Sequence, residues 1–264
     1  MKGRIKMKIL AIGDIVGDEA LEKVIQIIPK IKKENNIDFI IANGENIVKA
    51  RGINKVCFEK LVQAGVDAVT MGNHTYSNKE IYDIEDKRLI VPANYNEDTI
   101  YKGYGVYECN NNKIFVANLI GKGLGGRLNP FKTINNIINN LDNEIKIRII
   151  DFHGEYGNKK RTIAHMLKNK ISVVFGTHTN VQTADEKILY DGVGFITDIG
   201  MCGAVNSAIG YDLDFETKRY LEELKDDSIL ASDDEYKFNA CMFDIDESTG
   251  KTIDIKRINL EIQD

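Results

Sequence analysis

The sequence predicts a mixed α/β fold with helices on the outside and two sheets inside. Short apolar runs such as "KILAIGD" (8–14) alternate with amphipathic helical segments along most of the chain. At 104–120 the alternation gives way to an antiparallel hairpin with an Asn-rich turn, and it then resumes. Alternation of this kind implies strands in the core and helices packed over them. In such folds, ligands bind beyond the carboxyl ends of the strands.

Each predicted element follows from local pattern. The strands are apolar runs that end in glycine or polar residues, at 8–14, 37–46, 66–74, 88–94, 144–155, 171–179 and 192–201. The helices carry apolar residues at helical spacing, and we expect them at 19–35, 54–65, 78–86, 131–141, 158–169 and 214–225. A second hairpin turns around Ser248–Gly250 near the carboxyl terminus.

Length and composition limit the class of protein. The chain of 264 residues suits one domain, 1–264, and its formal charge is −5 without a long basic run, so we expect no stable binding to nucleic acid. Its four cysteines are scattered without a CxxC pair, as in reduced cytosolic proteins. The apolar run near the amino terminus spans about six residues, which is too short for a signal peptide or a membrane span. We therefore expect a cytoplasmic protein that does not contact membranes.

Polar residues follow five of the predicted strands at the point where each strand ends. They are Asp14; Glu45 and Asn46; Asn73 and His74; His153; and His178. If the strands share a sheet, these side chains converge on one edge. Three of the chain's four histidines belong to this set.

Each of these residues, taken alone, also has a purely structural explanation. Asp14 could form a turn or cap a helix, and the glycines of "NGEN" and "GNH" could simply make tight turns. His153 and His178 could be core histidines with satisfied hydrogen bonds. His165, which lies within a predicted helix and ends no strand, is assigned a structural role. The coincidence of five strand ends favours a metal site.

The residue types fit metal-dependent phosphoester hydrolysis. Carboxylate and amide oxygens together with imidazole nitrogens suit iron, manganese or zinc. A shared carboxylate can hold two metals about 3.5–4 Å apart, and a water bound there has its pKa lowered toward about 7 and can attack a phosphoester. His74, next to a ligand, suits general-acid catalysis on the departing alkoxide.

The motifs resemble those of the calcineurin-like metallophosphoesterases, and specifically the bacterial YmdB-type subfamily, over nearly the whole chain. They are "GDIVGD", "NGEN", "MGNHT", "PAN", "DFHGE", "GTHTNVQTAD" and "ITDIGM". The resemblance implies a four-layer α/β/β/α sandwich, a dinuclear centre and hydrolysis of small phosphoesters, with 2′,3′-cyclic nucleotides as the substrate class. It implies two divalent or trivalent transition metals, iron or manganese first, with zinc or magnesium as alternatives. The superfamily's usual Asp-x-His start is here Asp14-Ile15-Val16, a departure that the subfamily shares.

The resemblance also divides the ligands between two metals. Asp14 would bind the first metal, and Glu45 would bridge both. Asn73, His153 and His178 would complete the second metal's shell.

Three further positions complete the comparison. Asn46 would support the first metal or hydrogen-bond a bound phosphate, and His74 would be the proton donor. The subfamily usually reads Gly-Thr-His-Thr-His, whose second histidine ligates the first metal, but this chain has Asn180 there. Asn180 is either a substitute oxygen ligand, which would favour manganese or magnesium, or a gap that leaves one metal weakly bound or bound only with substrate.

Asn180 keeps a second class of function open. A regulatory nucleotide- or partner-binding protein with an impaired metal centre is the alternative to an enzyme. A Rossmann-type cofactor enzyme is disfavoured, because no GxGxxG follows the first strand. The loop "GKGLGG" (121–126) lacks the spacing of a P-loop, so we expect an active-site loop there rather than a phosphate cradle. The polar segment 203–235 would cover the site or form a contact in a homo-oligomer.

Overall fold

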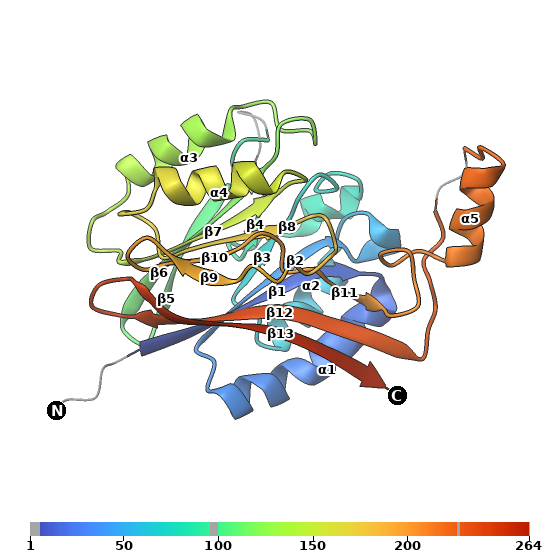
Figure 1. The fold of residues 1–264 in the computed structure, drawn as a ribbon, viewed down its shortest axis with the longest axis horizontal. Helices are drawn as coiled ribbons and strands as arrows, with labels where there is room; N and C mark the ends of the chain where they lie inside the picture. Colours follow the sequence, from blue (N-terminus) through green and yellow to red (C-terminus); the bar gives the residue numbers. More distant parts are fainter. Residues whose placement is uncertain (1–5, 96–99, 226–227, 264) are drawn as a thin grey trace.

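The computed structural model describes residues 6–95, 100–225 and 228–263, and these form two sheets packed face to face (Figure 1). Residues 1–5 of the amino-terminal segment and 226–227 of the segment 203–235 lie outside the described residues. In the described part of the chain, none of the helices is long and apolar enough to cross a membrane.

The first sheet has seven strands in the order β13-β12-β11-β1-β2-β3-β4. Its parallel part places β11, β1, β2, β3 and β4 side by side in one direction, while β12 runs antiparallel to β1, β11 and β13. The strands span Lys6–Val16 (β1), Phe39–Asn46 (β2), Ala68–Thr70 (β3), Leu89–Ile90 (β4), Met201–Ala204 (β11), Glu235–Asp246 (β12) and Thr252–Gln263 (β13).

The second sheet has six strands in the order β5-β6-β7-β8-β10-β9. Strands β6, β7, β8 and β10 are parallel, and the antiparallel β5 and β9 form the edges. The strands span Tyr104–Cys109 (β5), Asn112–Ile120 (β6), Ile147–His153 (β7), Val173–Thr177 (β8), Lys187–Leu189 (β9) and Val193–Ile196 (β10). The predicted hairpins at 104–120 and at the carboxyl terminus are both present.

Helices cover the outer face of each sheet, which confirms the α/β/β/α sandwich (Figure 1). One apolar core joins the first sheet to α1 (Asp18–Asn35) and α2 (Lys55–Gln63). A second core lies between the sheets, and a third joins the second sheet to α3 (Pro130–Asn139) and α4 (Gly157–Met166). Because β1, β2 and β7 are covered on both faces, they are almost continuously buried, as parallel strands in α/β folds are.

Two short 3₁₀ helices, η1 (Val48–Ala50) and η2 (Lys79–Asp83), follow strands β2 and β3. The second lies where the sequence predicts a short helix. After each of these helices the chain returns to the first sheet. Both helices therefore lie near the carboxyl ends of its strands.

The predicted strand 192–201 is wrong as a single element. Its first part is β10 in the second sheet, and its last residue begins β11 in the first sheet, so the chain crosses between the sheets at 197–200. The crossing depends on a close backbone approach: a Cβ on Gly13 would lie 2.1 Å from the carbonyl oxygen of Gly200, which itself has φ +79°. This contact is tertiary, so the apolar pattern did not indicate it.

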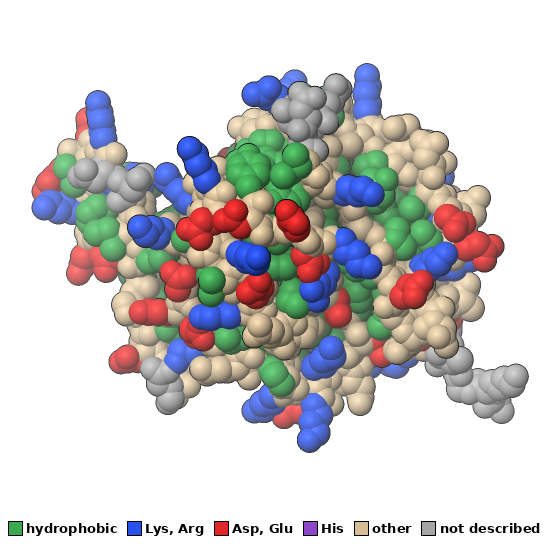
Figure 2. Space-filling model, turned by 180° about the vertical axis from the view of Figure 1, so that it is seen from behind, with side chains coloured by type: hydrophobic (Ala, Val, Ile, Leu, Met, Phe, Trp, Pro, Cys, Tyr) green, Lys and Arg blue, Asp and Glu red, His purple; other side chains and the backbone are tan. Residues whose placement is uncertain are grey.

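The segment 203–235 contains α5 (Leu213–Leu221), which stands away from the sandwich (Figure 1). Its apolar side chains are largely exposed, with Tyr220 at 72% and Leu221 at 80%. On the face shown in Figure 2, acidic and basic side chains are interspersed with small hydrophobic areas.

Candidate metal centre

The strand-end residues come together, but from two sheets rather than from one edge. Asp14, Glu45 and Asn73 stand at the carboxyl ends of β1, β2 and β3, whereas His153 and His178 end β7 and follow β8. The expectation of a single shared sheet is therefore wrong in this detail. Facing sheets bring the two groups together across the sandwich, and nitrogen and oxygen atoms of Glu45, His153 and His178 all lie within 4.8 Å of one another.

The Nε2 atom of His153 is the centre of this group. It lies 2.9 Å from Glu45 Oε1, 3.1 Å from Asn73 Oδ1 and 3.0 Å from His178 Nδ1. Two ligands about 2.1 Å from one ion and at right angles are about 3 Å apart, so these spacings are those of neighbouring ligands. All four side chains were predicted as ligands, and they meet as that prediction requires.

A buried chain of hydrogen bonds that the sequence did not indicate fixes the imidazole of His153. The Thr177 hydroxyl donates to Asp151 Oδ1 at 2.7 Å, so its oxygen accepts from His153 Nδ1 at 2.9 Å. Thr70 holds the other carboxylate oxygen of Asp151 at 2.6 Å. With its proton on Nδ1, a neutral His153 presents the lone pair of Nε2 to the cluster, which is the tautomer that a metal ligand needs.

The charges of the centre are buried and only partly compensated. Burial would lower the pKa of His153, but Glu45 and Asp14 outweigh it and raise that pKa to about 9. Burial opposes ionisation of Glu45, yet the adjacent His153 holds the Glu45 pKa below its usual range. Burial, with His153 next to it, lowers the pKa of His178 to about 4. Glu45 and Asp14 thus both favour a positive charge at His153, and a bound cation would supply that charge in place of the proton.

Two buried oxygen atoms of predicted ligands have no hydrogen-bond partner among the described residues. They are Asp14 Oδ1 and Asn180 Oδ1, which belong to the two residues expected at the first metal. The other oxygen of Asp14 accepts from the backbone N–H of His178 at 3.1 Å. Buried polar atoms are nearly always paired, and burial raises the pKa of Asp14 well above its ordinary value. Unpaired oxygens of this kind fit metal ligation.

The loop after β8 has an unusual backbone. His178 has φ +103° and Asn180 has φ +61°, both in the left-handed region. Such conformations cost about 1–3 kcal/mol each when the residue is not glycine. The cost is offset by contacts that hold the loop: Asp198 accepts from the Thr179 N–H at 3.0 Å and pairs with the buried Lys160 at 3.1 Å. Asp198 belongs to the motif "ITDIGM", but nothing in the sequence indicated this role for it or for Lys160.

Gly72 leaves room for the centre. A Cβ at this position would lie 2.3 Å from Glu45 Oε2 and 2.4 Å from His153 Nε2. The glycine of "GNH" therefore serves a close approach rather than only a turn. The donor set and this space together fit iron, manganese, zinc or magnesium.

The remaining predicted site residues lie beside the centre. The His74 backbone N–H donates to Glu45 Oε2 at 3.0 Å, and its ring Nδ1 lies 3.4 Å from the Ser77 hydroxyl. Burial lowers the pKa of His74 although Glu45 opposes this. Asn46 ends β2, is buried, and pairs with Val16 at the end of β1.

The glycine-rich loop 121–126 borders the centre through its backbone. The Gly121 N–H donates to the carbonyl oxygen of His153 at 2.8 Å, and Lys122 bridges to Gly126 across a turn. This position agrees with an active-site loop.

Comparison with known proteins identifies the family. The model of the family described as YmdB-like protein matches residues 10–258. The Bacillus subtilis (strain 168) protein named 2′,3′-cyclic-nucleotide 2′-phosphodiesterase is 36% identical over 255 residues, which is 96% of both chains. Among solved structures, a phosphatase from Mycoplasma pneumoniae has a TM-score of 0.91 at 28% identity, covering 99% of this chain and 95% of its own. A Thermus thermophilus protein has a TM-score of 0.89 at 29% identity, covering 97% and 99%. The chain belongs to the YmdB-like family of calcineurin-like metallophosphoesterases, which are hydrolytic enzymes.

Proposed function

We propose that this protein is a metal-dependent phosphodiesterase that hydrolyses small phosphoesters, with 2′,3′-cyclic nucleotides as its substrates. The observation that carries the proposal is the convergence of ligand atoms from two sheets on His153 Nε2, and two further predicted ligands, Asp14 and Asn180, have unpaired buried oxygens. The substrate class comes from the relative that is 36% identical over 96% of both chains.

The centre would hold two metals. Asp14 and Asn180 are suited to the first metal by their unpaired buried oxygens, and Asn46, the last residue of β2, would support it or hydrogen-bond a bound phosphate. Glu45 has oxygens on two sides, toward His153 Nε2 and toward the His74 N–H, which suits a bridging carboxylate.

The second metal would be held by Asn73, His153 and His178. The Asn73 Oδ1 and His178 Nδ1 atoms lie 3.1 Å and 3.0 Å from His153 Nε2. Bound metals supply Lewis acidity and a nucleophile from water at neutral pH. Their identity, iron or manganese before zinc or magnesium, is part of the proposal.

The chain's own contribution is to orient the groups and to move one proton. Hydrolysis breaks a P–O bond, and the departing alkoxide oxygen must take up a proton. His74 would donate it as the general acid. Because burial lowers the pKa of its imidazolium, His74 gives up the proton more readily than an exposed histidine would. The hydrogen bond from its backbone to Glu45 fixes its position relative to the centre.

The experiment is hydrolysis of 2′,3′-cAMP by the purified protein supplied with Mn²⁺ or Fe²⁺. Wild type should release the nucleoside monophosphate, Glu45→Ala should be inactive, and His74→Ala should lose about 100-fold or more in kcat, as expected for a general acid. A Glu45→Ala protein that keeps the full rate would overturn the dinuclear mechanism.

Compartment and assembly stay predictions. The four cysteines are free, as expected in the reducing cytosol, where we place the reaction. We further propose that copies of the chain associate through α5, because its apolar side chains lie in solvent. Light scattering on wild type and on a Tyr220→Glu, Leu221→Glu protein tests this association.

A further inference from the structure

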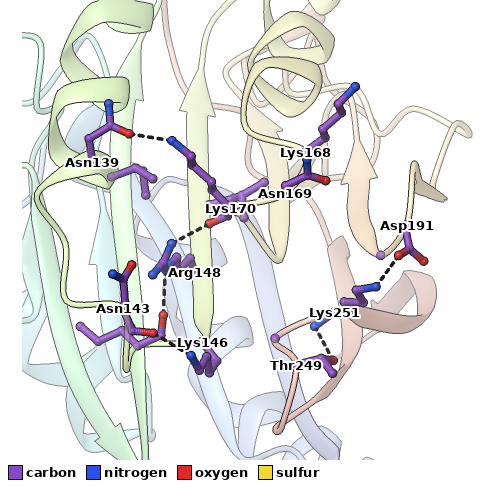
Figure 3. Close-up of a pocket in the computed structure, with 15 residues that line it drawn as sticks. Asn139, Asn143, Lys146, Arg148, Lys168, Asn169, Lys170, Asp191, Thr249 and Lys251 are labelled. Carbon is purple, nitrogen blue, oxygen red and sulfur yellow. Dashed lines mark hydrogen bonds and ion pairs between the residues drawn. The ribbon is translucent and has the colours of Figure 1, made fainter.

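A basic cavity lies at the amino-terminal end of β7 (Figure 3), whereas the metal centre lies at the carboxyl end of this strand. Its volume is about 630 Å³, within the range of about 300–1,000 Å³ that is usual for small-ligand pockets. Fifteen residues line it, and five of these are lysine or arginine, whereas Asp191 is the one acidic residue among them. This balance is notable in a chain whose formal charge is −5.

Three separate segments supply the cations. Lys146 and Arg148 precede and begin β7, Lys168 and Lys170 follow α4, and Lys251 lies in the turn between β12 and β13. Hydrogen bonds join these segments: Ser172 accepts from the backbone of Arg148 at 3.0 Å, and its carbonyl accepts from Thr252 at 2.8 Å. The cavity is therefore part of the folded core of the sheet rather than a chance meeting of loops.

Most of these cations lack a carboxylate partner. Arg148 is held by backbone carbonyl oxygens, at 2.8 Å from Ile145 and 3.3 Å from Lys170. Lys170 donates to the Asn139 side chain at 2.7 Å, and Lys146 to the Asn143 carbonyl at 2.8 Å. Figure 3 shows these bonds, and it shows Asp191 already engaged by Lys251.

The described residues thus give Lys146, Arg148, Lys168 and Lys170 no acidic neighbour within ion-pair distance. Arg148 is partly buried, and burial lowers the pKa of its guanidinium, although the nearby Asp142 opposes this shift. A guanidinium is weakly hydrated and can donate two N–H groups to one phosphate, so Arg148 is suited to bind an anion.

We propose that this cavity binds a small ligand that carries a chain of phosphates, such as a nucleoside triphosphate or inorganic tripolyphosphate. Several cations around one concave site match a compact polyanion better than a single charge. The fixed Arg148 guanidinium offers paired N–H donors to phosphate oxygens, and the lysines offer mobile charges around it. Asn139 and Asn143 add neutral polar groups at the rim.

The proposed site is separate from the metal centre. Arg148 and His153 are at opposite ends of β7, and five residues of extended strand span about 17 Å. A ligand in the cavity cannot contact the metals, so its binding should not depend on the catalytic residues.

Calorimetric titration of the purified protein with tripolyphosphate and with ATP tests the proposal. A Lys146→Glu, Lys168→Glu, Lys170→Glu protein removes exposed cations of the cavity without touching Arg148. The control, Lys30→Glu, Lys33→Glu, Lys79→Glu, makes the same change of charge at exposed lysines elsewhere. We expect the cavity variant to bind either ligand roughly tenfold or more weakly and the control to bind as wild type does, because only near charges act strongly.

The cavity variant should also keep its activity on 2′,3′-cAMP, which shows that it is folded. Equal affinity for tripolyphosphate and ATP would show that the cavity recognises the phosphate chain alone. Tighter binding of ATP would show that the cavity also recognises the nucleoside. Wild type that binds neither ligand, or variants that weaken binding equally, would overturn the proposal. Binding of a short single-stranded RNA through these lysines, without binding of tripolyphosphate, would replace it with a nucleic-acid contact.

Discussion

The Nδ1 atom of His153 and the hydroxyl of Thr177 are 2.9 Å apart in the buried interior of the second sheet, and Asp151 holds that hydroxyl from its other side. Because Thr177 gives its own hydrogen to Asp151, it can only accept from the imidazole. The tautomer of a central ligand is thus decided by two residues that do not enter the metal shell.

Thr177→Val should weaken the centre without unfolding the protein. The isosteric valine removes the acceptor for His153 Nδ1–H, and loss of such an orienting bond typically costs about 10–100-fold in metal affinity or activity. Metal titration and kcat/KM measure the effect. Thr70→Val is the control, because it removes a hydrogen bond to Asp151 but leaves the contact with His153 in place. Equal losses in the two variants would contradict the proposed orienting role.

Gly72→Ala should abolish metal binding. The added methyl group would lie 2.3 Å from Glu45 Oε2, so the carboxylate or the loop must move. A displacement of about 1 Å can cost about 100-fold in rate. Metal analysis and turnover check the prediction, and Gly121→Ala, where the nearest atom is 3.5 Å away, is the control that should stay active. An active, metal-loaded Gly72→Ala protein would refute the argument from space.

Asn180 should prove to be a ligand rather than a gap. Its unpaired buried oxygen predicts that Asn180→Ala purifies with one metal fewer per chain, whereas Asn180→Asp, which keeps the oxygen, retains both. Asn180→His, which restores the subfamily's usual ligand, should raise turnover. If the alanine variant keeps its full metal content and rate, the first metal does not use this residue. Absence of metal and activity in wild type, both restored by histidine, would favour the regulatory alternative.

Lys160→Met should destabilise the fold. The ammonium group is fully buried and pairs with Asp198, and removing one partner of a buried pair costs about 3–5 kcal/mol because the other charge is left alone. Denaturant unfolding of the full chain measures the loss. Lys60→Met breaks an ion pair with Glu22 at the surface and should leave the unfolding midpoint nearly unchanged. A similar midpoint shift in both variants would show that burial of the pair is not decisive.

The positions of the polar residues at strand ends could be predicted from the sequence, because the carboxyl ends of parallel strands lie at one edge of their sheet. His153 and His178 each follow a mostly apolar run, and such a run predicts both the strand and the point where it ends. The motifs of the family then predicted which ligands bind which of the two metals. That distribution stays a prediction, whereas the sandwich and the family are confirmed.

The features that the sequence did not indicate depend on contacts between residues that are far apart in the chain. Thr177 and Asp151 lie inside apolar strands, and no spacing links them to each other or to Thr70. The crossing at 197–200 depends on Gly13, far away in the chain. The basic cavity likewise does not correspond to a run of basic residues in the sequence, because its charges come from three segments that only the fold brings together.

The residue at position 72 offers a practical test of whether a relative of unknown activity is a hydrolase. The position has no side chain to contribute, yet a single methyl group there would lie 2.3 Å from Glu45 Oε2 and 2.4 Å from His153 Nε2, both predicted metal ligands. A genome sequence that keeps every carboxylate and histidine of the centre but replaces this glycine should encode a folded protein without hydrolase activity. Searches that score only the ligands would count such a protein as an enzyme, and inspection of this one glycine would separate the two.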